Sequence, residues 1–240
     1  MRGLVAVAVL SSAAAAQMLE PPPVTYPQLP QAAATDAAIV PAGWKIAERA
    51  SGDLNGDGKP DLAVLLKMDS KANFLPIPDS SPPATFDTNP FLLAVAFADG
   101  ASGYRVAAST HRFFRRPDIP YSGDVPPGEG DSVRIERGTL LLSNEYLRGH
   151  DSYRFRWDTG AFRLIGYESG GSSGGCAETI SINYLTGKVL WENTPISADK
   201  GVAVARRVKP GALPTLESFD DASFIPSDTI AGDAPPCTAP

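Results

Sequence analysis

Histidine and cysteine are scarce in this chain of 240 residues, which has two of each. His111 and His150 stand alone, with no H-E-x-x-H sequence and no cluster of cysteines and histidines around them. Zinc sites in sequences are recognised by such clusters at short, regular spacings. The sequence therefore gives no support for a zinc site.

Basic residues are also a minority, with 21 Lys and Arg against 27 Asp and Glu. A protein that wraps nucleic acid or binds an anionic membrane needs a clustered positive surface that neutralises phosphate. Here the acidic residues are spread along the chain, and basic residues gather only in the short segment 112–116. We expect no nucleic-acid partner.

No apolar run is long enough for a transmembrane helix, which needs about 20 residues. The apolar run at residues 4–10 follows the single positive residue Arg2 and precedes small residues that end at Ala16. This order is typical of a secretory signal peptide. We expect cleavage near Ala16, a secreted or periplasmic location and no membrane anchor. Losing Arg2 gives the mature chain a net charge of −7.

The two cysteines, Cys176 and Cys237, would then reach an oxidising compartment. Disulfides persist there, and closing a loop of this length stabilises a fold by up to about 4 kcal/mol in the chain-entropy model. We expect these cysteines to pair. The alternative is two unpaired thiols.

Patterns of amphipathic helices are nearly absent, whereas proline (23) and glycine (22) are abundant. Short β-branched and aromatic runs between turn residues favour an all-β fold of antiparallel, hairpin-rich sheets with few short helices. A partial propeller-like arrangement, a sandwich and an open barrel all fit this pattern. Strands are expected at residues 44–49, 62–67, 91–98, 104–109, 132–136, 139–146, 152–157, 162–168, 178–184, 188–192 and 202–209.

Two hairpins are the clearest. Tyr153, Phe155 and Trp157 alternate with polar residues before the turn at 158–160, and a second turn lies at 185–188. The organisation we expect is a signal peptide (1–16), a Pro/Ala-rich linker (17–42), a β domain (43–222) and a tail (223–240) that a disulfide tethers. The long loops 68–89 and 110–131 are either functional or surface decoration.

Residues 52–61 (GDLNGDGKPD) carry an oxygen-bearing side chain at every second position before an apolar run. Asp53, Asn55 and Asp57 can surround a cation, Lys59 can offer its carbonyl and Asp61 can close the ring. The twelfth position, which is Glu in an EF-hand, is Val64, and a strand-like rather than helical run follows. We expect a structural Ca²⁺ site that binds at roughly 0.1 to 1 mM. The alternative is a solvated β-turn that binds nothing.

This D-x-N-x-D-G-x-x-D pattern resembles the FG-GAP or VCBS-type calcium hairpin of integrin α-subunit propellers and many bacterial secreted proteins. The resemblance covers about ten residues and implies the same ligands. With one copy of the loop, we expect something shorter than a complete propeller. Residues 184–188 and 213–220 resemble a group of bacterial secreted or periplasmic proteins that carry a single such loop, which implies no activity.

Catalytic signatures are weak. Residues 170–174 match G-x-S-x-G, but Ser172 lacks the strand-to-helix context of a hydrolase nucleophile, and both histidines precede it. A carboxylate pair for glycoside hydrolysis is available from Glu145, Asp151, Glu168 and Glu178, at separations that only a structure gives.

One segment suggests a partner surface. Guanidinium and aromatic groups together can hold an acidic glycan or a protein, although a strand edge with exposed arginines is the plainer interpretation. The residues are Arg112, Phe113, Phe114, Arg115 and Arg116.

Our leading hypothesis is a non-catalytic, calcium-stabilised β-protein that binds a protein or a polysaccharide. The alternative is a secreted hydrolase of glycan or peptide that uses a carboxylate pair, which predicts acids clustered in one deep cleft. A third hypothesis is a purely structural envelope component.

Overall fold

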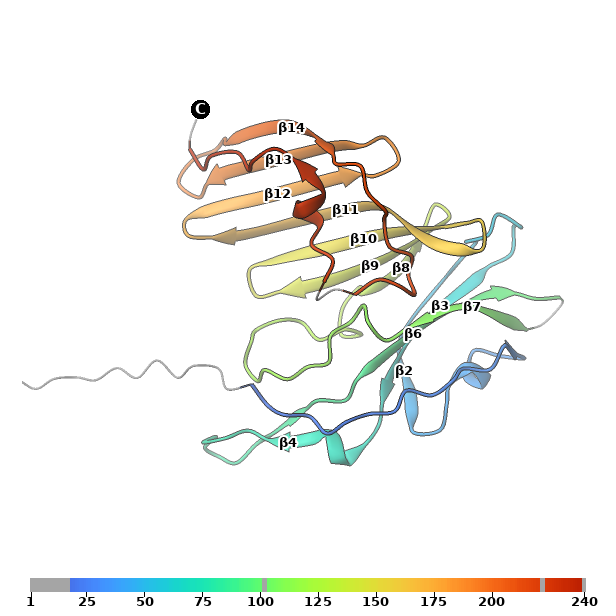
Figure 1. Cartoon of the computed structure of the whole chain (residues 1–240). Helices are drawn as coiled ribbons and strands as arrows, with labels where there is room; N and C mark the ends of the chain where they lie inside the picture. Colours follow the sequence, from blue (N-terminus) through green and yellow to red (C-terminus); the bar gives the residue numbers. More distant parts are fainter. Residues whose placement is uncertain (1–17, 101–102, 221–222, 239–240) are drawn as a thin grey trace, which may run out of the picture.

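The computed structural model describes residues 18–100, 103–220 and 223–238 and is all-β (Figure 1). Its helical parts within these residues are three short 3-10 turns, η1 (Ala37–Ile39), η2 (Lys71–Asn73) and η3 (Pro226–Thr229). No helix in the described ranges is long and apolar enough to cross a membrane. The predicted all-β fold with few short helices is confirmed, while the predicted signal peptide lies outside the described residues.

Two antiparallel sheets form the fold, and each has two edge strands, so neither closes into a barrel. The first sheet has the order β1-β7-β6-β3-β2 and contains β1 (Ala32–Ala33), β2 (Trp44–Gly52), β3 (Asp61–Met68), β6 (Phe91–Ala98) and β7 (Tyr104–Thr110). A small hairpin of β4 (Phe74–Pro76) and β5 (Thr85–Asp87) accompanies it.

The second sheet has eight strands, in which β8 to β15 follow one another in chain order. They are β8 (Val133–Glu136), β9 (Thr139–Tyr146), β10 (Gly149–Asp158), β11 (Ala161–Ser173), β12 (Cys176–Asn183), β13 (Lys188–Pro195), β14 (Val202–Val208) and β15 (Ile230–Ala231).

Both predicted hairpins are present. Asp158 pairs with Ala161 across the turn Thr159-Gly160, whose residues have φ angles of 48° and 86°. Asn183 pairs with Lys188 across the second turn. Glycine tolerates the positive φ that such turns require, so the turn residues fix where each strand ends.

The main core lies between the two sheets. Phe97 of the first sheet contacts Trp157 of the second at a ring-centroid distance of 4.8 Å, and Phe162 is also in ring contact with Phe97. The C-terminal residues Leu216 and Phe219 are buried in the same core. Apolar burial of this kind holds the two sheets together.

The edge strands β2 and β8 also join the sheets. The Glu48 carboxylate accepts hydrogen bonds from the backbone N–H groups of Ser132 (3.1 Å) and Val133 (2.9 Å). Partial burial raises the pKa of Glu48, and the two backbone hydrogen bonds oppose that rise. This contact fixes how the first sheet meets the second.

The N-terminal segment covers the outer face of the first sheet. Ile39 is buried there against a cluster that includes Val64 of β3 and Leu92 of β6. In Figure 1 this blue segment and the second sheet lie on opposite sides of the first sheet. Residues 18–42, which the sequence predicts as a linker, therefore pack onto the folded unit, and β3 and β6 are buried on both faces.

Candidate functional site

The acidic loop connects β2 to β3, and β3 begins at Asp61, so the predicted strand after the loop is confirmed. The two oxygens of Asp53 accept hydrogen bonds from Gly56 N (2.7 Å) and Gly58 N (2.9 Å). Both glycines have φ near 80°. Hydrogen bonds from Gly58 and Gly56 lower the pKa of Asp53, because they favour its ionised form.

The next two candidate ligands are held in the same way. Asn55 Oδ1 accepts from Asp57 N, and Asp57 Oδ1 accepts from Lys59 N, each at 2.9 Å. The second oxygen of Asp57 lies 4.0 Å from the Lys59 ammonium. The loop therefore fixes its side-chain oxygens before any ion binds.

Asp61 differs from the other acids of the loop because its exposed fraction is 0%. Its Oδ2 accepts from Leu54 N (2.8 Å) and Asn55 N (3.2 Å). Its Oδ1 accepts from Ala98 N (2.9 Å) at the end of β6. Three hydrogen bonds of this kind are what a buried carboxylate needs. Asp61 thus anchors the loop to the first sheet, a role that the sequence pattern did not reveal.

The loop fits calcium in its donor chemistry, since carboxylate and amide oxygens are the ligands that Ca²⁺ prefers. The bonded oxygens of Asp53, Asn55 and Asp57 each accept one hydrogen bond and retain a second lone pair. Within the described residues, no group of three or more His, Cys, Asp or Glu side chains is arranged to hold a metal ion. The assignment of Asp53, Asn55, Asp57, Lys59 and Asp61 as ligands stays a prediction.

The predicted partner surface at 112–116 does not form as one exposed patch. Phe113 and Phe114 are buried in the main core, with exposed fractions of 1% and 4%. Arg116 donates to the Pro22 carbonyl (2.6 Å) and to Asn73 Oδ1 (2.9 Å), so it ties loops together. Only Arg112 and Arg115 remain exposed. The aromatic contacts expected for a partner are therefore not offered by this segment.

A groove of about 530 Å³ lies on the second sheet and is lined in part by polar side chains. The strand register explains it, because the inner face changes from apolar to polar along the strands. One row across β9 to β12 holds Leu142, Tyr153, Tyr167 and Ile182. A second row on the same face lies four residues away along the strands and is mostly polar or glycine. Across β9 to β13 it holds Tyr146, Gly149, Gly171, Glu178 and Asn193.

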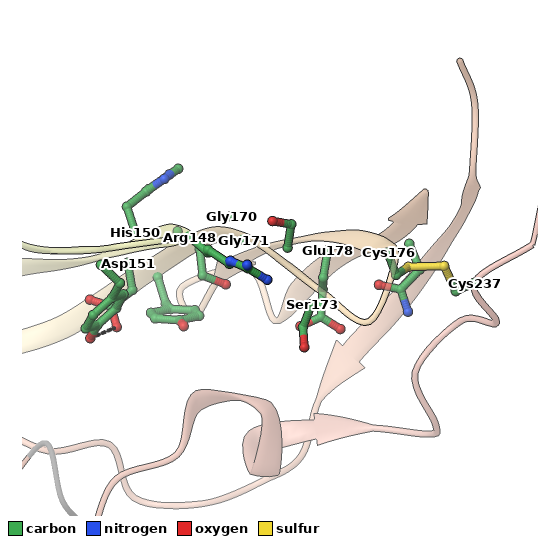
Figure 2. A pocket seen from close by; sticks show the side chains of 15 residues that line it. Arg148, His150, Asp151, Gly170, Gly171, Ser173, Cys176, Glu178 and Cys237 are labelled. Carbon is green, nitrogen blue, oxygen red and sulfur yellow. Dashed lines mark hydrogen bonds between the residues drawn. A yellow bond between two sulfur atoms is a disulfide. The ribbon is translucent and has the colours of Figure 1, made fainter. Parts of the chain in front are cut away.

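Two glycines give the groove a floor of bare backbone. A Cβ on Gly149 would lie 2.6 Å from the Gly170 carbonyl oxygen, so the close approach of β10 and β11 requires glycine there. Asp151, Ser173 and Glu178 point to one side of this floor, and the segment leading to Cys237 lies on the same side (Figure 2). His150 points to the opposite side. His150 also lines the groove, but its imidazole points away from Asp151 and Glu178.

The structure brings together two of the four candidate carboxylates. Asp151 accepts hydrogen bonds from Tyr146 Oη (2.9 Å) and Asn144 Nδ2 (3.0 Å), and Glu178 accepts one from Trp191 Nε1 (2.9 Å). They lie two strands and two residues apart, so their Cα atoms are about 12 Å apart.

The other two candidate carboxylates lie elsewhere. Glu145 lines a separate cavity beside the loop before β8, and Glu168 lines a third one on the outer face of the second sheet. The sequence alone does not show which of the four acids share a groove. Neighbouring residues of a strand point to opposite faces, and the register between strands decides which acids meet.

Tyrosine and arginine complete the groove. Burial raises the pKa of Tyr167 to about 12, so its hydroxyl stays neutral at physiological pH. Arg148 is exposed at the turn between β9 and β10 and has no ion-pair partner among the residues that the structure describes. The groove thus combines acceptors, hydroxyl groups and one cation.

The G-x-S-x-G match lies in the hairpin of β11 and β12, where Ser172 pairs with Ala177. The strand β12, not a helix, comes directly after it, so it is not the turn of a hydrolase nucleophile. His111 stacks on Tyr26 at a ring-centroid distance of 3.9 Å. Ser172, His150 and Asp151 all line the groove, but His150 and Asp151 point to opposite sides of the sheet, so they do not form the Asp–His pair of a catalytic triad.

The predicted disulfide is confirmed, because Cys176 and Cys237 are bonded. It borders the groove and ties the C-terminal segment to the start of β12 (Figure 2). Such a bond is consistent with an oxidising compartment.

No protein-family model, curated protein or solved structure shows significant similarity to the chain.

Proposed function

We propose that this chain is a calcium-stabilised, non-catalytic β-protein of a secreted or periplasmic compartment, which binds a polysaccharide or protein partner. The observation that carries the binding function is the polar groove over Gly149 and Gly171, whose Asp151 and Glu178 are held by hydrogen bonds from their own sheet. Side chains positioned before binding lose little entropy when a partner arrives.

The acidic loop supports the calcium part of the proposal. Its three exposed or half-buried ligand candidates already have fixed oxygens, and the disulfide supports the oxidising compartment in which millimolar calcium sites are common. An ion there would stabilise the junction of β2 and β3.

We expect 10 mM calcium to raise the melting temperature of the protein by about 3 to 10 °C relative to chelator. An ion bound at roughly 0.1 to 1 mM stabilises the folded state by about 1.4 to 2.7 kcal/mol at that concentration. Asp57→Ala should remove this shift, because it removes one of the proposed calcium ligands. Asp57 is exposed, so its loss should leave the fold intact. Differential scanning calorimetry measures both effects.

The control is Glu217→Ala, which removes an exposed carboxylate far along the chain from the loop and should keep the full calcium shift. An equal shift in Asp57→Ala and the unmodified protein would contradict the loop as the calcium site.

A hydrolase is the second candidate function, because Asp151 and Glu178 share one groove. Under the leading proposal, Asp151 and Glu178 only accept hydrogen bonds and do not cleave the ligand. Incubation of the protein with neutral polysaccharides should therefore release no reducing ends. The hydrolase would instead be established if the protein released reducing ends, Glu178→Gln abolished this release and Glu168→Gln preserved it. A colorimetric reducing-end assay distinguishes the two results.

A further inference from the structure

Asn193 marks one end of the groove with an unsatisfied hydrogen-bond acceptor. Its side chain lines the groove with an exposed fraction of 8%, and its Nδ2 donates to the Pro235 carbonyl at 2.7 Å. That bond fixes the orientation of the amide, so Oδ1 is the atom of the side chain that still needs a hydrogen-bond donor. Oδ1 has no hydrogen-bond partner among the described residues. Buried polar atoms almost always have a partner, so this oxygen indicates a donor that is not part of the described chain.

The neighbouring side chains also act as hydrogen-bond acceptors. Glu178 pairs directly with Asn193 across β12 and β13, and Asp151 lies one row inward on β10. All three present oxygens that accept hydrogen bonds. A ligand that meets them must therefore carry several O–H or N–H groups close together.

Arg148 restricts the ligand further. Its guanidinium is an obligate donor, so the ligand must also offer acceptor atoms. Its positive charge offsets one of the two negative charges of Asp151 and Glu178, so the groove carries little net charge. Hydroxyl groups satisfy both demands, because each one donates and accepts.

The sheet topology excludes an extended peptide that would add a strand at the groove floor. Strands β9 to β13 are internal, and each is paired on both sides. Strand addition needs an exposed sheet edge with unpaired backbone groups. Recognition in this groove therefore has to come from side chains.

The shape of the groove suits a flat, ring-shaped ligand. Glu178 and Tyr146 lie in the same row at opposite sides of the two glycines, with Cα positions about 14 Å apart. Tyr146 is 43% exposed and offers an aromatic face. A ring can lie over the bare backbone between them.

We propose that the groove binds a neutral sugar unit of a polysaccharide, with sugar hydroxyls donating to Asn193 Oδ1, Glu178 and Asp151 and accepting from Arg148. Tyr146 packs against the sugar ring. This inference rests on the proposed binding function and specifies its ligand class and its site.

The test is affinity electrophoresis of the purified protein in gels that contain laminarin, dextran, xylan or galactomannan, with an oligolysine peptide tested by calorimetry. We expect retardation by at least one of the four polymers and no binding of oligolysine. Glu178→Gln and Arg148→Ala should each weaken that binding by about 10- to 100-fold, because each removes a charged hydrogen-bonding group. Ser173→Trp, at an exposed position in the groove, should block it.

Glu168→Gln is the matched control, since it makes the same change on the opposite face of the sheet and should leave the dissociation constant within twofold. Melting curves of every variant verify that it is folded. Binding of oligolysine in place of the polymers, or retardation by none of the four, would overturn the sugar assignment. If a polymer retards the protein and none of Glu178→Gln, Arg148→Ala and Ser173→Trp changes this, the groove is not the binding site. The proposed binding function would then stand, with its site elsewhere.

Discussion

Replacing Asp61 with alanine is expected to lower the free energy of unfolding by about 3 to 5 kcal/mol, the largest effect of any single change in the acidic loop. The change leaves the backbone N–H groups of Leu54, Asn55 and Ala98 without their acceptor in a buried place. A buried donor that loses its partner keeps its full desolvation cost. Urea unfolding, followed by tryptophan fluorescence in the presence of chelator, measures the loss.

Asp57→Ala is the comparison that separates this structural role from calcium binding. Asp57 is exposed and accepts one hydrogen bond, from Lys59 N, so its loss in chelator should cost no more than about 1 kcal/mol. Asp61→Ala should destabilise the protein in chelator and in calcium alike. If the two variants were equally stable in chelator, Asp61 would not anchor the loop.

Phe113→Ala should cost about 3 to 5 kcal/mol of stability, as expected when a large buried aromatic side chain is truncated. The Phe113 ring contacts Tyr153 and Phe219 at centroid distances of 5.3 and 5.1 Å, so its removal opens a cavity where the loop, the second sheet and the C-terminal segment meet. The midpoint of urea unfolding reports the change.

Arg112→Ala is the control for this second prediction, because Arg112 is the exposed neighbour of Phe113. Its replacement should change stability by no more than about 0.5 kcal/mol. A small effect of Phe113→Ala, similar to that of Arg112→Ala, would contradict the buried position and restore Phe113 as a residue available to a partner.

The hairpins were predictable because their signals are local. Alternation of Tyr153, Phe155 and Trp157 with polar residues gives a strand with one buried face, and Thr159-Gly160 ends it. The disulfide followed from two cysteines and an expected oxidising compartment, and the structure contains it. These features depend on neighbours in sequence or on counting, and both are visible in one chain.

The Arg112–Arg116 segment shows where such reasoning failed. Phe113 and Phe114 read as a surface cluster because arginines flank them, but the segment crosses between the second sheet and the C-terminal residues, where both rings are buried. The linker prediction for residues 17–42 rested on their proline- and alanine-rich composition, yet residues 18–42 pack against the first sheet. Their burial depends on a sheet face formed by residues much later in the chain.

The sequence by itself determined the all-β class, the main hairpins, the cysteine pair and the loop whose side chains carry oxygen at alternate positions. Only the tertiary structure decided that Asp61 is an internal anchor, that Asp151 and Glu178 share a groove with Asn193, and that Glu145 and Glu168 do not. The physical reason is register: a strand alternates its side chains between two faces. Which residues meet on one face therefore depends on how distant strands align and what covers them.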